Sequence, residues 1–369
     1  MCVYKVIEVA DRAGMKEFLS LPEKIYDGDP YWVPEIKSEV KRQLDSRRNP
    51  YFKSNKLKLL LCYKQGVCIS RASLVINTHD REAYFGYFES INDITAVKYL
   101  FDEMFVVCRQ EKISKLEGPF NPQYYGSAGS LLNNYKEMPA FYEIYNPEYY
   151  IELMYKLGFE LAKIGKTWIN TNCSEVVKKY GNGGILPLKI GDYSCKKVSW
   201  LNIFKDIRAI SEIYEEAFKE NYHFSQISFS EYLYLIRILF LAISPSLVYI
   251  IYYKNEPAGF IISMYDINPL IKKYNGANGL LNKIKVLFTR KNLTRLLVFA
   301  YGMKKKYRNS KGFLLGTRIF CKLLSNFKES VGAWITVGNT ASESIAKHLD
   351  YKPYKEFGVY TKKVIQISN

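Results

Sequence analysis

The sequence contains few acidic residues for its length. Its 369 residues include 36 Asp and Glu against 53 Lys and Arg, which gives a formal net charge of +17 at pH 7. A chain with this balance is attracted to anionic partners, such as a nucleotide-linked substrate, a tRNA or an acidic membrane surface. A lysine-rich surface with no particular partner explains the composition equally well, so the charge alone leaves the partner open.

Metal ligands and paired cysteines are also scarce. The three histidines, His79, His223 and His348, are far apart, and the seven cysteines form no C-x-x-C pair. Neither pattern has the ligand spacing of a zinc site, so we expect no metal. An odd number of dispersed cysteines is typical of reduced thiols in the cytosol, where disulfide scaffolds are rare.

No stretch is long and apolar enough to suggest a membrane span. The first residues, MCVYKVIEVADRAGMKEF, contain no apolar core of a signal peptide. The longest apolar region, residues 233–253, contains Arg237 and Pro245, so we interpret it as a helix, a turn and a strand. The sequence also lacks a Walker loop, a G-x-G-x-x-G before a helix and an H-E-x-x-H motif. We therefore expect a cytoplasmic protein without a transmembrane segment.

The second half of the chain contains a strand, a cationic turn, a helix, a strand and a helix in succession. The apolar run Leu296–Ala300 precedes the turn KKKYRNSKG at residues 304–312. An amphipathic helix is predicted over residues 313–327, a strand over 332–337, and a second helix from Asn339. Backbone amides at the start of a helix, with lysines and arginines nearby, bind phosphate oxygens. The pattern therefore predicts a phosphate site at this turn.

The first half repeats the same plan in the same order. Strands, a turn and a helix are predicted in succession over residues 57–63, 67–77, 84–89, 90–93 and 95–111. We infer two copies of one fold, about 190 residues apart.

The two copies predict two domains, at residues 1–192 and 193–369. The turn of the first copy, Ser90-Ile91-Asn92-Asp93, contains no Lys, Arg or Gly, so we expect no pyrophosphate there. In the second copy, the basic segment 268–291 is predicted to be a lid, an acceptor-site helix or a packing element. Residues 356–364 are predicted to return as an edge strand.

The second-half pattern resembles the GCN5-related N-acetyltransferase (GNAT) superfamily, whose core binds the pyrophosphate of acetyl-CoA at this turn. Tyr307-Arg308 and Lys311-Gly312-Phe313 are similar to the Tyr-Arg and Lys-Gly-Ile of that family, and Met303 takes the place of a Val. The turn is one residue longer, at Asn309-Ser310, and Ala346 stands where the family has a helix Tyr. The resemblance implies that the following residues bind acetyl-CoA or another acyl-CoA: Met303, Arg308, Ser310, Lys311, Gly312, Phe313, Leu314 and Asn339.

Five further segments extend the resemblance over nearly the whole chain. They are LPEKIYDGDPYWVPE, NPYF, GYFESIND, GPFNP and YNPEYY, and they resemble a bacterial group of two-copy acetyltransferase-like proteins. The resemblance implies an α/β fold of the α+β mixed-sheet kind, with two tandem acyl-CoA N-acyltransferase-like domains.

N-acyl transfer places few fixed demands on sequence, because the protein mainly holds an amine against a thioester. A base need only remove one proton. Tyr301, at the end of its strand, and Glu89, in the matching place of the first copy, are the predicted catalytic residues.

Three functions remain open at this point. The first is an acyl-CoA-dependent N-acyltransferase, with acetyl-CoA as donor and a small-molecule or peptide amine as acceptor. The second is an aminoacyl-tRNA-dependent transferase that resembles the Fem family, which also pairs two such folds. The third is a binding protein without catalysis. The sequence does not define the oligomeric state.

Overall fold

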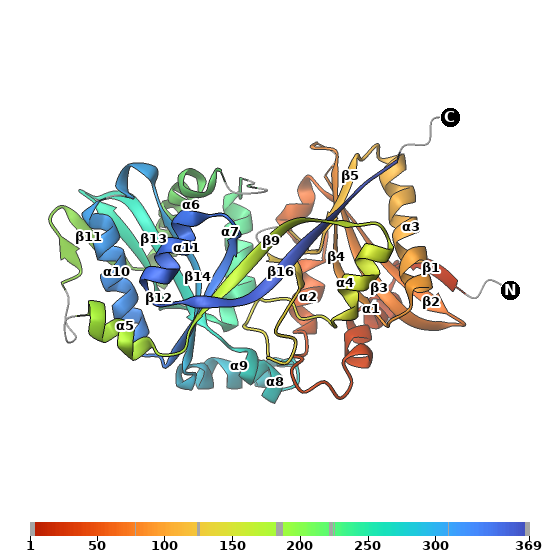
Figure 1. Cartoon of the computed structure of the whole chain (residues 1–369), viewed down its shortest axis with the longest axis horizontal. Helices are drawn as coiled ribbons and strands as arrows, with labels where there is room; N and C mark the ends of the chain where they lie inside the picture. The colour runs from red at the N-terminus through yellow and green to blue at the C-terminus, as the bar shows by residue number, and fades with distance from the viewer. Residues whose placement is uncertain are drawn as a thin grey trace. The chain divides into compact units, whose positions relative to one another are not determined.

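The computed structural model describes residues 4–77, 79–123, 126–181, 187–220, 224, 226–308 and 310–365. Helices and strands build mixed sheets, so the predicted α/β class is confirmed (Figure 1). The chain forms two compact units: unit 1 contains residues 1–166, 271–278 and 355–369, and unit 2 contains residues 167–270 and 279–354. The units differ from the two halves of the sequence, because residues 167–192 belong to unit 2 and residues 355–369 to unit 1.

The sheet of unit 1 starts as an antiparallel meander and ends with a strand from far along the chain. Its strand order is β1-β2-β3-β4-β5-β16. The elements are β1 (Tyr4–Glu8), α1 (Arg12–Ile25), α2 (Lys37–Gln43), η1 (Pro50–Lys53), β2 (Lys56–Lys64), β3 (Val67–Asn77), β4 (Glu82–Ser90), α3 (Ile94–Gln110), β5 (Lys115–Gly118), β6 (Phe120–Asn121), β7 (Ser127–Ala128), β8 (Ser130–Leu131), α4 (Tyr149–Lys156), β9 (Glu160–Asn170) and β16 (Lys352–Lys363).

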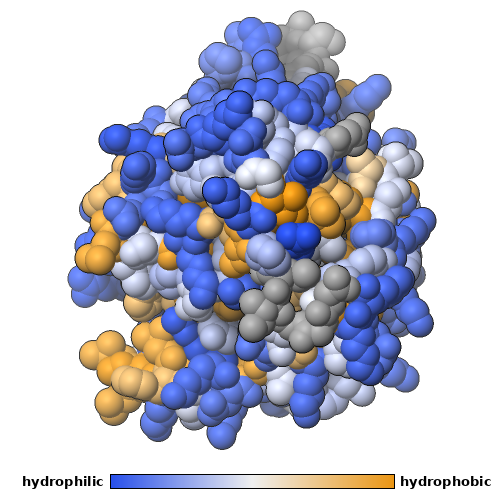
Figure 2. Space-filling view, turned by 90° about the vertical axis from the view of Figure 1, so that its left-hand side faces the viewer, coloured by the Kyte–Doolittle hydropathy of each residue, from blue (hydrophilic) through white to orange (hydrophobic). Residues whose placement is uncertain are grey.

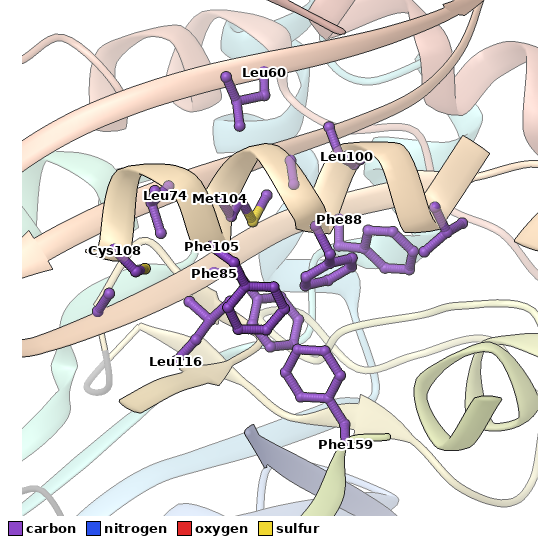
Figure 3. Close-up of a cluster of buried hydrophobic side chains, with 14 of the residues drawn as sticks. Leu60, Leu74, Phe85, Phe88, Leu100, Met104, Phe105, Cys108, Leu116 and Phe159 are labelled. Atoms are coloured by element: carbon purple, nitrogen blue, oxygen red, sulfur yellow. The ribbon is translucent and has the colours of Figure 1, made fainter. Parts of the chain in front are cut away.

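Helix α3 covers this sheet with an apolar face. Asp93 caps it, because its carboxylate accepts from the backbone N–H groups of Thr95 and Ala96. Apolar residues recur every three or four positions, which places them on one side of the helix. That side packs against the strands in the core drawn in Figure 3, where Phe85, Phe88, Met104 and Phe159 meet.

Unit 2 repeats the meander, the helix and the parallel strand. Its strand order is β15-β14-β13-β12-β11-β10, and the last four residues of β9, Thr167–Asn170, also belong to this unit. The elements are α5 (Cys173–Tyr180), β10 (Lys189–Ile190), β11 (Tyr193–Lys197), η2 (Trp200–Asn202), α6 (Ile203–Phe218), α7 (Phe229–Ile238), η3 (Leu239–Leu241), β12 (Ile243–Tyr253), β13 (Glu256–Tyr265), α8 (Asn268–Lys273), α9 (Leu280–Thr289), η4 (Arg290–Asn292), β14 (Arg295–Met303), η5 (Lys305–Tyr307), α10 (Lys311–Leu324), β15 (Glu329–Thr336) and α11 (Thr340–His348).

In each sheet, the strand that pairs in parallel with one neighbour has a register shift in its antiparallel pairing with the other neighbour. The pairing of β3 with β4 shifts between Arg71 and Ser73, and that of β13 with β14 shifts between Ile262 and Ser263. The parallel pairing of β14 with β15 stops at Val298 opposite Gly332, although β14 continues to Met303. Beyond Val298, β14 stays paired with β13 up to Met303, while its side toward β15 is outside the parallel ladder.

Two predictions for the second copy need correction or refinement. The tail strand, β16, is not an edge strand, because it pairs with β5 and also neighbours β9 in the strand order. Of the basic segment 268–291, residues 271–278 belong to unit 1. There the Lys272 ammonium donates to the carbonyl of Trp32 at 2.8 Å, so this part of the segment serves packing.

Candidate functional site

The predicted phosphate turn, residues 304–312, joins the end of β14 to the start of α10. Ser310 caps α10, because its Oγ accepts from the backbone N–H of Gly312 at 3.0 Å. Gly312 fits closely against Tyr193, where an added Cβ would lie 2.8 Å from the ring. A helix start leaves backbone N–H groups without intrahelical partners, so this end of α10 has the donors that an anion requires.

Most of the lysines of this turn are already paired with carboxylates. The Lys305 ammonium lies 2.5 Å from Glu220, and the Lys306 ammonium lies 2.7 Å from Glu256. Lys304 is 3% exposed and forms ion pairs with Glu212 and Glu256. An incoming phosphate would therefore compete with these carboxylates for the lysines.

Arginine 308 also has local partners. Its guanidinium donates to the carbonyl of Met303 at 3.1 Å and to that of Ala217 at 2.8 Å. In the part of the chain that the structure describes, Arg308 and Lys311 are the cations of this turn for which no carboxylate lies within ion-pair distance. Lys311 is exposed at the first position of α10, which makes it the cation best placed for an added anion.

The other predicted cofactor residues have mixed surroundings. Met303 is buried, Phe313 is half-buried, and Leu314 is 48% exposed on the outer side of α10. Asn339 caps α11, with its side-chain oxygen accepting from the N–H of Ser342 at 3.2 Å. The structure thus brings Met303, Arg308 and residues 310–314 together around the turn, whereas Asn339 has a demonstrated capping role.

Tyr301 faces α10 from β14. Its ring packs edge-on against Phe320 at 5.6 Å, and a Cβ added to Gly316 would lie 3.0 Å from its hydroxyl. Burial raises the pKa of Tyr301 well above its ordinary value. The phenol is therefore protonated at neutral pH and can donate a proton, but it is a poor base.

Glu89, the other predicted catalytic residue, is the centre of a polar cluster in unit 1. We call Glu89, Tyr26, Tyr150, Arg71 and Glu35 the Glu89 cluster. The Glu89 carboxylate accepts from the hydroxyls of Tyr26 and Tyr150, each at 2.8 Å. Arg71 lies opposite Glu89 in the strand register and pairs with Glu35 at 2.7 Å.

The environment sets the charge of this carboxyl. Burial raises the pKa of Glu89 to about 7, although Arg71 and the hydroxyls of Tyr26 and Tyr150 favour its charged form. Arg71 itself is fully buried and donates to the carbonyl of Phe18 at 2.5 Å. A carboxyl with a pKa near 7 can both accept and release a proton under physiological conditions, as a general base must.

The backbone around Glu89 is held by neighbouring segments. Tyr87 has a positive φ of 45°, and its N–H donates to the Asn121 side chain at 2.6 Å. The Tyr26 ring stacks on Trp32 with the centroids 5.2 Å apart. These contacts fix the strand end from which the Glu89 carboxylate projects.

Sequence reasoning found Glu89 but not its partners. Tyr26 and Glu35 come from LPEKIYDGDPYWVPE, Tyr150 comes from YNPEYY, and Asn121 comes from GPFNP. The five segments that extend the family resemblance could therefore have indicated this site, since four of them contribute residues to the Glu89 cluster or to the contacts that support it. Arg71 gave no signal, because a single arginine in a predicted strand does not show that it will be buried.

The first-copy turn carries the opposite charge to the second-copy turn. Asp93 caps α3 and also accepts from the Lys64 ammonium at 2.8 Å and the Tyr4 hydroxyl at 3.0 Å. Partial burial favours its neutral form, but the bonds from Lys64 and from the N–H of Ala96 hold the pKa of Asp93 below its usual range. A carboxylate thus occupies the helix start where an anion would bind.

Neither a metal-binding cluster nor a membrane-spanning helix is found among the residues that the structure describes. Those residues form no cluster of three or more His, Cys, Asp or Glu with metal-binding geometry. Across the same residues, no helix combines the length and apolar character needed to cross a bilayer.

Two proteins are similar to this chain in sequence over almost their full lengths. Protein YghO of Escherichia coli (strain K12) is 21% identical over 375 residues, which covers 96% of this chain and 94% of YghO. A bacterial ceramide synthase of Caulobacter vibrioides (strain NA1000 / CB15N) is 22% identical over 375 residues, covering 97% of each. No family model matches the sequence.

Solved structures are similar in fold over the whole chain. A tandem GNAT protein from the clavulanic acid biosynthesis pathway has a TM-score of 0.61, with 99% of this chain and 100% of that chain covered at 10% identity. A GCN5-related N-acetyltransferase from Sphaerobacter thermophilus has a TM-score of 0.54, with 100% and 98% covered at 10% identity. At this identity the likeness concerns the fold.

Proposed function

Because the chain has the tandem GNAT fold, we propose that it transfers an acyl group from an acyl-CoA to an amine. The amine nitrogen attacks the thioester carbonyl carbon, the carbon–sulfur bond breaks, and the CoA thiolate leaves. The amine loses a proton to a base as the amide forms, and the thiolate takes one up. Holding the two reactants together supplies ~7–11 kcal/mol of the barrier. The observation that carries the proposal is the strand, cationic turn and helix start of the second copy.

The donor is proposed to bind at the start of α10. Backbone N–H groups of residues 310–314 and the exposed Lys311 would hold its diphosphate, with Met303 and Arg308 beside them. The end of β14 supports this assignment, because beyond Val298 the side of the strand that faces β15 is outside the parallel ladder. Asn339 is proposed to contribute indirectly, by holding the start of α11.

Within unit 1, Glu89 is proposed as a general base, because its carboxyl can take up a proton near neutral pH. Its half-buried carboxyl has a pKa of about 7, and its two tyrosine partners fix its orientation. Tyr301, whose pKa is raised by burial, is proposed only as a proton donor. A positioned general base contributes about 10²–10⁴-fold to a rate.

The sequence relative narrows the proposed substrates. A ceramide is an N-acylated long-chain amino alcohol, and the bacterial ceramide synthase is similar to this chain along its whole length. We therefore propose a long-chain amino alcohol as the acceptor and a long-chain acyl-CoA as the donor. Acetyl-CoA, the donor expected from the sequence, is the alternative that the binding experiment distinguishes.

The decisive measurement is calorimetric binding of acetyl-CoA and palmitoyl-CoA to the whole chain. Lys311→Glu should weaken binding by about tenfold, because it reverses a charge beside the diphosphate. Lys322→Glu is the matched control, since Lys322 is an exposed lysine in the last turn of the same helix. Absence of binding to the wild type, or equal losses in the two variants, would reject the donor site.

A binding protein without catalysis is the second candidate. It is favoured by the ion pairs of Lys304, Lys305 and Lys306, which leave fewer cations for a diphosphate. Acyl-CoA binding with no thiol release in the presence of amines, long-chain amino alcohols included, would support it. Transfer from an aminoacyl-tRNA but not from any acyl-CoA would instead support the Fem-like alternative.

A further inference from the structure

Helix α9 presents an apolar stripe to solvent. Successive helix residues are rotated by about 100°, so positions 280, 281, 284 and 288 fall within one arc of about 100°. The side chains at these positions are 75%, 75%, 38% and 74% exposed: Leu280, Leu281, Ile284 and Phe288. Val286 is fully buried on the opposite side and anchors the helix. An ordinary surface helix has the reverse arrangement, with its apolar face inward.

A second group of exposed apolar side chains belongs to the same unit. Leu201 in η2 is 96% exposed, and Trp200 and Phe204 beside it are 47% and 59% exposed. The Trp200 ring lies 6.1 Å from that of Phe240 in η3, which is itself 46% exposed. Large apolar side chains therefore stand out on both η2 and η3.

Arg290 links this group to α9. Its guanidinium donates to the carbonyl of Phe240 at 2.9 Å and to that of Leu241 at 2.8 Å. The two groups therefore lie near each other in unit 2, and we call them together the apolar face. Figure 2 shows apolar side chains protruding at the lower edge of the molecule, the level at which α9 lies in Figure 1. Several large apolar side chains exposed near one another mark an interaction site.

The chain segment that contains α9 is basic. Residues 267–328, which include α9, contain 15 Lys and Arg and no Asp or Glu. Lys283 and Lys285 flank the apolar stripe on α9, and Lys291 follows it. Lysines beside exposed leucine, phenylalanine and tryptophan are the composition of elements that lie in a membrane interface.

We infer that the apolar face docks onto the surface of an anionic lipid bilayer. Leu280, Leu281 and Phe288 enter the boundary between headgroups and acyl chains, and the neighbouring lysines bind the anionic headgroups. A second copy of the chain is a poorer occupant. A two-fold interface would place the same basic surface against itself, so like charges would face each other. The inference rests on the exposed face alone and stands or falls independently of the acyl-transfer proposal.

Sedimentation with vesicles tests the inference on the full chain. Vesicles of phosphatidylcholine with about one third phosphatidylglycerol should bind the wild type at low salt, and pure phosphatidylcholine vesicles should bind it at least about tenfold less. The variant Leu280→Ser, Leu281→Ser, Phe288→Ser should lose about tenfold or more in partitioning to the anionic vesicles. All three side chains are exposed, so the variant should keep its circular dichroism spectrum.

Val67→Ser with Tyr155→Ser is the matched control. These side chains are 58% and 51% exposed in unit 1 and lie outside the apolar face. This control should bind the vesicles like the wild type. The inference is overturned if the wild type does not sediment with anionic vesicles, or if the α9 variant binds as well as the control. It is also overturned if light scattering shows a wild-type dimer that the α9 substitutions dissociate.

Discussion

The two copies place different chemistry at equivalent positions. In each copy a serine, Ser73 or Ser263, is the first paired residue after the register shift. Two residues before Ser73 lies Arg71, opposite Glu89, and two residues before Ser263 lies Ile261, opposite Tyr301. The first copy thus has a buried arginine and a carboxylate where the second has an aliphatic side chain and a phenol. By this count, Glu89 and Tyr301 stand at corresponding positions of the two registers.

The turns that follow β4 and β14 differ in charge, since the first is acidic and the second is basic. In the first copy Asp93 occupies the helix start, whereas in the second copy the neutral Ser310 caps a helix that begins with Lys311. One copy therefore has a carboxylate and an arginine at the strand end and an acidic turn, and the other has a phenol and an aliphatic side chain at the strand end and a basic turn. Under the proposed function, proton transfer would belong to the first copy and anion binding to the second.

Glu89→Gln should give the largest effect if proton transfer belongs to the first copy. We expect turnover to fall by about 10²–10⁴-fold, because the amide cannot accept the proton. The wild-type kcat/KM should rise with pH and level off above about 7, the pKa of Glu89, since only the ionised form is a base. The variant should have lost this rise.

Tyr301→Phe is the control for this division, and its turnover should fall by less than about tenfold. The comparison would be reversed if Tyr301→Phe cost more than Glu89→Gln. Release of the CoA thiol is followed over pH 5–9, with circular dichroism to show that both variants are folded.

The next largest effect is expected on the free energy of unfolding, which should fall by different amounts when Arg71 in β3 and Ile261 in β13 are replaced. Arg71→Met leaves Glu35 and Glu89 without their cation, and breaking a buried ion pair lowers the free energy of unfolding by about 3–5 kcal/mol. Ile261→Met is the matched change and should cost less than about 1.5 kcal/mol, because it conserves apolar volume. Urea unfolding followed by fluorescence measures both. Equal losses would mean that Arg71 is no more important to the fold than an aliphatic side chain.

Exchanging the two helix caps should have the smallest effect on stability. Asp93→Ser keeps a capping side chain but removes the partner of Lys64 and Tyr4, so we expect a loss of about 0.5–1 kcal/mol. Ser310→Asp should change the unfolding free energy by less than about 0.5 kcal/mol, since both residues cap well. Its effect should appear as weaker acyl-CoA binding, because it adds a negative charge where the diphosphate is proposed to lie. Unchanged binding would count against the turn as the anion site.

The local order of elements could be predicted from the sequence. The periodic apolar pattern of residues 95–111 corresponds to α3, and the cationic turn lies between β14 and α10 as expected. Asn339 was expected to open a helix, and it caps α11. These features depend on neighbouring residues, which is why short-range patterns reveal them.

Two features could not be predicted in this way: which charged residues pair with each other, and the exchange of segments by which residues 355–363 join the sheet of unit 1. Glu212 and Glu256 neutralise Lys304, which lies far from both in the sequence, and no local pattern shows which charges will meet. A buried arginine such as Arg71 is similarly invisible, because arginine is normally found at the surface. The place of β16 beside β5 depends on contacts between residues more than 200 positions apart.

The exchange of segments has a consequence for how the chain matures during synthesis. Because residues 355–363 fill a place in the sheet of unit 1, β5 has no partner on that side until they emerge from the ribosome. The first unit, although translated first, cannot be completed first. Its unpaired strand is a target for other nascent chains in the interval, and a chaperone that shields it would govern the yield of native protein.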